Sequence, residues 1–276
     1  MKKFAFFTGL AATIALTATT AEAKRRVMPW MCLERCHENI TNDLIQLHRI
    51  KDILSAVSFE AYDLDFGSVL KNNGFTPVFD EIRGMGLEGI AMITTANMDK
   101  VRDLWKNTTY FIDQAAVEIM RKGYDGYNID FEPSSGPTPT AEDAKLFAKF
   151  VDDFAKRLHS LGRGFKLSVD VATWSPLLDY DLLAATEVDT IMTMDTYCGN
   201  DDLFLTRVDN AVEKIGLEKL GIGLEIVNPN TGKPFTKEQM QLRFDKIKAV
   251  NDKEIDIWEC PIPELWLPFL EDFVNY

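Results

Sequence analysis

Residues 125–133 read DGYNIDFEP, a stretch in which acidic and amide side chains alternate with large apolar ones. Successive side chains of a β-strand point to opposite faces, so Asn128, Asp130 and Glu132 share one face of this predicted strand. An unpaired charge is costly in an apolar interior. The polar face therefore fits the interior of a closed barrel near its mouth, while the apolar face packs against surrounding helices.

Eight short apolar runs, each suited to a strand, alternate with amphipathic helical patterns along the chain. They are residues 27–33, 56–62, 89–95, 126–132, 166–172, 190–196, 220–227 and 255–258. Eight such units predict a parallel sheet closed into a single (β/α)8 TIM barrel, in the α/β class. Only about 25 residues separate the last two runs, so no α+β insertion domain is expected there. An open doubly wound sheet is the alternative, but the sequence WMCLERC after the first run lacks the Gly-rich turn of that fold.

Capping signals delimit three of the predicted helices. Thr140 precedes a helix with one apolar face that ends before Gly162, and a helix after Thr109 ends at Gly123. Thr236 begins another, in which a glutamine three residues later completes a capping box.

The N-terminus has the pattern of a secretory signal peptide: two lysines, an apolar run over residues 4–16 and small residues before a cleavage site. We expect residues 1–23 to be removed and residues 24–276 to form the barrel. An uncleaved anchor is the alternative, but the apolar run is shorter than the roughly 20 residues that span a bilayer. The sequence therefore predicts a protein without a membrane span that is secreted or enters a lysosomal-type lumen.

The composition is acidic, with 30 Lys and Arg against 43 Asp and Glu and a formal net charge of −13. Such a surface repels nucleic acid and anionic membranes, so no nucleic-acid partner is expected. The three histidines and four cysteines form only a weak CxxxC metal-ligand spacing, so neither a metal nor another cofactor is expected. We expect the chain to be a monomer.

Four cysteines, Cys32, Cys36, Cys198 and Cys260, are compatible with an oxidising compartment. Two sets of pairings remain open. In the first, Cys260 pairs with Cys32 or Cys36, because the last strand of a barrel lies beside the first. In the second, Cys32 pairs with Cys36 and Cys198 pairs with Cys260.

Active sites of such barrels lie at the C-terminal ends of the strands. Aromatic residues expected at these ends are Trp30, Tyr62, Trp174, Tyr197 and Trp258. Acidic residues expected there, besides Asp130 and Glu132, are Glu60, Asp170, Asp195 and Glu225. Aromatic platforms beside carboxylates suit a sugar ring, because its apolar face stacks and its transition state for hydrolysis is cationic.

Crowded carboxylates raise one another's proton affinity, and Glu132 is the one nearest the mouth. It is therefore the best candidate for a general acid. Alternatively, these acids could pair with buried Lys or Arg or bind a divalent cation, but basic residues are scarce at the predicted strand ends.

The stretch DGYNIDFE resembles the fourth-strand signature of glycoside hydrolase family 18, the chitinase family, which is D-G-x-[D/N]-x-D-x-E. The variant with Asn128 is similar to that of the di-N-acetylchitobiase branch. The resemblance implies that Glu132 protonates the glycosidic oxygen, and that Asp130 orients the substrate's own acetamide, which replaces a protein nucleophile. It also implies that Asn128 and Asp125 support Asp130 through hydrogen bonds, and that Trp258 forms the floor of the sugar subsite.

The function implied is a secreted retaining glycosidase that cleaves β-1,4-linked N-acetylglucosamine in chitooligosaccharides or related glycans. A catalytically weak carbohydrate-binding protein on the same barrel is the alternative, because three strands depart from the family pattern. The third has MITTA for S-x-G-G, and the seventh has GLEIVN for Y-G-R. The sixth has MDTYCG for M-x-Y-D, which places Thr196 where the acetamide-binding tyrosine belongs, unless a one-residue shift gives that role to Tyr197. A barrel phosphodiesterase would need a histidine or metal cluster.

Overall fold

The computed structural model describes residues 25–33 and 40–276, and the predicted signal peptide lies outside them. Eight parallel strands close into a barrel, because β1 pairs with both β2 and β11. The barrel strands in spatial order are β1 (Arg26–Met31), β2 (Ala56–Asp65), β4 (Glu88–Asn97), β5 (Gly126–Ser135), β6 (Lys166–Val171), β7 (Thr190–Thr193), β8 (Leu220–Glu225) and β11 (Glu254–Trp258). The predicted single TIM barrel is confirmed.

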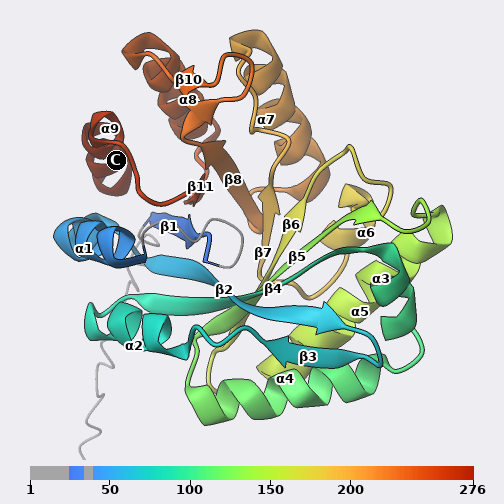
Figure 1. The fold of residues 1–276 in the computed structure, drawn as a ribbon. Helices are drawn as coiled ribbons and strands as arrows, with labels where there is room; N and C mark the ends of the chain where they lie inside the picture. Colours follow the sequence, from blue (N-terminus) through green and yellow to red (C-terminus); the bar gives the residue numbers. More distant parts are fainter. Residues whose placement is uncertain (1–24, 34–39) are drawn as a thin grey trace, which may run out of the picture.

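Helices surround the strands (Figure 1). They are α1 (Ile40–Ile50), η1 (Lys51–Ile53), α2 (Thr76–Gly84), α3 (Met98–Leu104), α4 (Thr108–Lys122), α5 (Ala141–His159), α6 (Tyr180–Ala184), α7 (Asp201–Ile215), α8 (Lys237–Val250), η2 (Glu264–Trp266) and α9 (Leu267–Asn275). Capping boxes begin α5 at Thr140 and α8 at Thr236, and Gly123 ends α4 in the left-handed conformation. These helix boundaries follow from local capping chemistry, which is why they could be predicted.

The remaining strands are short additions to the barrel. β3 (Val69–Asn72) runs antiparallel along the extended end of β2. Between β8 and β11 the chain holds only the hairpin of β9 (Val227–Asn228) and β10 (Lys233–Pro234), followed by α8. The expected absence of an insertion domain between these strands agrees with the structure of that segment.

The alternation in DGYNIDFEP is resolved by two separate apolar cores. Ile129 and Phe131 belong to the large core between the strands and the helices, where Phe131 stacks on Phe150 of α5. A smaller cluster inside the barrel consists of Met28, Trp30, Ala56, Ile90, Met92 and Met192, with Trp258 packed against it. The polar side chains of β5 face this inner side of the barrel, where Asn128 Nδ2 lies 3.8 Å from Sδ of Met192.

Two of the four cysteines, Cys198 and Cys260, are buried free thiols. Burial raises the pKa of both. The pairing of Cys260 with Cys198, and its pairing with Cys32 or Cys36, are therefore wrong for this structure. Cys36 lies outside the described residues.

Asp252 is a fully buried acid just before β11, and burial raises its pKa to about 8. An acid with a higher pKa in the folded than in the unfolded chain takes up a proton on folding, so its contribution disfavours folding increasingly as pH rises from about 4 to about 8. We expect Asp252→Asn to remove a stability loss of about 1.4 kcal/mol per pH unit over this window. Urea unfolding at several pH values measures the slope, and exposed Glu213→Gln on α7 should leave it unchanged. Equal slopes for the wild type and Asp252→Asn would contradict this assignment.

Candidate active site

A cavity of about 180 Å³ opens at the C-terminal ends of the barrel strands. It is lined by Trp30, Asp130, Glu132, Trp174, Met194, Tyr197, Glu225 and Trp258. The structure thus brings together six of the residues that the sequence assigned to the site. It adds Met194, the first residue of MDTYCG, which had no predicted role in the site, and Glu225, which was placed at a strand end without a role.

The two acids of β5 lie at different depths because they are two residues apart on one face. Asp130 is 2% exposed and accepts a hydrogen bond from Thr94 Oγ1 of β4 at 3.4 Å. Glu132 is half-buried and lies closer to the mouth. A buried carboxylate and a more accessible acid therefore line one small cavity.

Glu132 also lines a second cavity, of about 420 Å³. This cavity is formed by residues 133–139, at the end of β5 and just after it, and by Trp174, Ser175 and Pro176 after β6. Glu132 and Trp174 belong to both cavities, so they mark the boundary between them. An acid that protonates the oxygen between two bound groups would need such a position.

Tyr197, and not Thr196, lies at the cavity. β7 ends at Thr193, and Thr196 Oγ1 donates to the carbonyl oxygens of Thr193 at 2.8 Å and Gly223 at 2.7 Å. Tyr197 lines the cavity instead. A Cβ on Gly223 would lie 2.7 Å from Cε1 of Tyr197, so a glycine in β8 makes room for this ring. Burial, followed by the carboxyl of Asp170, raises the pKa of Tyr197 well above its usual range, which keeps its hydroxyl protonated.

Three indoles form the apolar walls. Trp30 and Trp258 meet edge to face, with ring centroids 5.7 Å apart and an interplanar angle of 80°. Trp174 is 56% exposed and stands at the boundary of the two cavities. The Nε1 of Trp30 is buried and has no acceptor among the described residues. These walls can stack on sugar rings on both sides of Glu132.

A hydrogen-bonded layer lies beneath the cavity. Asn128 Nδ2 donates to Ser168 Oγ at 3.0 Å and to Asp170 Oδ1 at 3.1 Å. Asp170, which the sequence predicts to bind substrate, is fully buried and is not among the residues that line the cavity. Burial, followed by the charge of Asp130, raises the pKa of Asp170 well above its usual range. A neutral Asp170 spares Asp130 like-charge repulsion.

The structure also corrects the placement of Tyr62. Strand alternation would put it on the same face as Glu60, which accepts a hydrogen bond from Leu33 N inside the barrel mouth. A register shift between Glu60 and Tyr62 turns Tyr62 to the outer face, where its hydroxyl donates to Glu118 and its ring packs against Tyr124. The bulge is therefore the physical reason for the error.

Two acids predicted for the site serve other parts of the fold. Asp195 accepts hydrogen bonds from Thr173 N at 3.0 Å and Tyr180 OH at 2.6 Å, and so braces the loop that carries Trp174. Asp125 precedes β5 at the opposite end of the barrel, where it accepts from Gly89 N at 2.8 Å. Five residues of strand, roughly 16 Å, separate it from Asp130, so it cannot support that residue.

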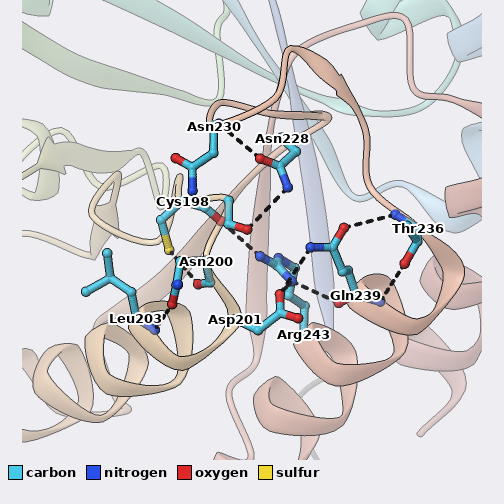
Figure 2. Close-up of polar contacts among 10 residues, drawn as sticks. Cys198, Asn200, Asp201, Leu203, Asn228, Asn230, Thr236, Gln239 and Arg243 are labelled. Carbon is cyan, nitrogen blue, oxygen red and sulfur yellow. Dashed lines mark hydrogen bonds and ion pairs between the residues drawn. The ribbon is translucent and has the colours of Figure 1, made fainter.

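The loop that carries Tyr197 is held by a buried arginine, Arg243 of α8 (Figure 2). Arg243 is 1% exposed, and its guanidinium donates to Cys198 O at 2.9 Å and to Asp201 Oδ1 at 2.7 Å. It also lies over the ring of Phe235, 4.3 Å from the centroid. The residue next to Tyr197 is thereby tied to α8.

Within the described part of the chain, no group of three or more His, Cys, Asp or Glu side chains is arranged to hold a metal ion. None of the described helices is both long and apolar enough to cross a membrane.

No family model matches the sequence, and no curated protein matches it. Solved structures do match. A chitinase from Chromobacterium violaceum aligns with a TM-score of 0.74 at 12% identity, over 91% of this chain and 99% of that one. The spore cortex-lytic enzyme SleL of Bacillus megaterium aligns with a TM-score of 0.75 at 12% identity, over 91% and 75%. A GH18 chitinase from Pseudoalteromonas aurantia aligns with a TM-score of 0.67 at 11% identity, over 91% of this chain and 99% of that one.

The chain has the fold of these chitinases. At such identities the likeness is one of fold, and the chemistry has to be argued from the site itself.

Proposed function

We propose that this chain is a retaining glycosidase that hydrolyses β-1,4-linked N-acetylglucosamine, in chitooligosaccharides or related glycans, by substrate-assisted catalysis. The position of Glu132 at the boundary of two cavities, with buried Asp130 on the same strand face, carries the proposal. The fold of the chitinase neighbours supports it.

In the first step, the acetamide oxygen of the sugar in the smaller cavity attacks its own C1, and the bond from C1 to the leaving oxygen breaks. Glu132 gives its proton to that oxygen. Asp130 accepts the acetamide N–H and stabilises the positive charge of the cyclic intermediate. Tyr197, which follows β7, holds the acetamide, and Trp258 and Trp30 stack on the ring.

In the second step, water gives a proton to the Glu132 carboxylate and attacks C1, which reopens the ring to the acetamide. Two inversions at C1 give net retention. Trp174 lies beside Glu132 in both cavities and would contact the leaving group. The signal-peptide pattern of residues 1–23 supports export, on which Lys24 would be the first residue of the mature chain.

The test is hydrolysis of chitotriose by the purified mature chain, followed by proton NMR. We expect the β-anomer of the new reducing end to appear before mutarotation. Appearance of the α-anomer first would contradict a retaining mechanism. Sugar binding without turnover would instead favour the alternative, a carbohydrate-binding protein on the same barrel.

A further inference from the structure

The smaller cavity is acidic throughout. Its carboxyl groups are those of Asp130, Glu132 and Glu225, and its other lining residues are aromatic or methionine. No lysine, arginine or histidine of the described residues lines it. The walls therefore offer a bound molecule negative charge and aromatic faces, both of which attract a cation.

Glu225 is the carboxyl that the proposed reaction does not use. It ends β8 on the face where Gly221 and Gly223 leave room for inner side chains, and it pairs in register with Trp258 of β11. It is half-buried, and no described residue forms a hydrogen bond or an ion pair with its carboxyl group. By contrast Asp195, a predicted strand-end acid outside the cavity, accepts hydrogen bonds from Thr173 and Tyr180.

The position of Glu225 indicates which part of a substrate it meets. It lines the cavity of the reacting sugar but not the second cavity beyond Glu132. The reacting sugar must keep its acetamide for the proposed chemistry. A charged group opposite Glu225 therefore belongs to the next ring on the side away from the leaving group.

We propose that Glu225 is a specificity residue that favours oligosaccharides with a free amino group on this neighbouring ring and disfavours those with a carboxylate there. The inference rests on the proposed function. An ammonium beside Glu225 and Trp258 gains charge pairing and a cation–π contact, whereas a carboxylate meets the like charges of Glu225 and Asp130. Burial raises the pKa of Glu225, which fits a carboxyl without a protein counter-charge.

The test uses three fluorogenic glycosides that share the reacting N-acetylglucosamine and the leaving group. The neighbouring ring is glucosamine, N-acetylglucosamine or N-acetylmuramic acid. For the wild type at low salt we expect kcat/KM to fall in that order, with about a tenfold spread carried mainly by KM. Adding about 1 M salt should shrink the spread because it screens charge.

Glu225→Gln is the matched variant, because it keeps the shape of the side chain and removes its charge. We expect this variant to reduce the spread in kcat/KM among the three glycosides at least threefold. An unchanged spread, or an equal loss of kcat on all three glycosides, would overturn the proposal. Equal kcat/KM values of the wild type on the three glycosides would also overturn it. If all three are still hydrolysed, the proposed function is not contradicted by that result.

Binding separates the two proposals if the wild type hydrolyses none of the three. Calorimetry with the corresponding sulfur-linked, non-hydrolysable disaccharides then gives the order of affinities directly. If affinity falls from the amine to the acetamide to the carboxylate, and if Glu225→Gln reduces these differences, the role of Glu225 is supported even though the enzymatic proposal has failed. Equal affinities overturn it.

Discussion

Replacing Glu132 with glutamine is expected to lower kcat on an unactivated chitooligosaccharide by about a thousandfold. Glutamine fills the same space at the boundary of the two cavities but has no proton to give to the leaving oxygen. KM should change little, because Asp130, Trp258 and Trp30 still hold the reacting sugar. Initial rates of chitotriose cleavage measure the loss.

The leaving group provides an internal control for this prediction. A fluorogenic phenol-type leaving group departs without much help from an acid. Glu132→Gln should therefore lower kcat far less on such a glycoside than on chitotriose. Exposed Glu213→Gln should retain wild-type rates on both substrates. Equal losses on good and poor leaving groups would show that Glu132 acts in some way other than proton donation.

The parts of the fold that could be predicted are those that short-range physics determines. The alternation in β5 identifies an inner and an outer face, and capping boxes at Thr140 and Thr236 locate helix starts to the residue. The placement of Asp130 and Glu132 side by side on one face could be predicted for the same reason, since one strand presents both. Such features depend on residues a few positions apart.

Sequence reasoning goes wrong, or leaves alternatives open, where alternation is interrupted or where a partner is distant in sequence. Tyr62 turns outward because a bulge follows Glu60, which nothing in the local sequence marks. Tyr197 enters the cavity because β7 ends early and because Gly223 of another strand leaves space for its ring. The role of Asp195 depends on Thr173 and Tyr180, whose positions follow from the closed barrel.

Replacing Arg243 with alanine is expected to lower the free energy of unfolding by about 3 to 5 kcal/mol. The change leaves the carbonyl of Cys198 and the carboxylate of Asp201 without their buried cation, and it removes the stack on Phe235. Arg243→Lys should lower the free energy of unfolding by less, because the positive charge remains. The planar guanidinium and its two separate contacts are still absent from this variant. Urea unfolding of the three proteins measures the differences.

The exposed ion pair of Arg83 with Asp80 supplies the control, because both side chains are about 60% exposed. Arg83→Ala should lower the free energy of unfolding by less than about 1 kcal/mol. Arg243 holds the carbonyl of Cys198 (Figure 2). Cys198 follows Tyr197 directly, so loosening this carbonyl should also displace the phenol from the cavity. Arg243→Lys, the better-folded variant, is therefore expected to raise KM for chitotriose more than it lowers kcat. A large stability loss with unchanged KM would show that Arg243 supports the fold but does not position Tyr197.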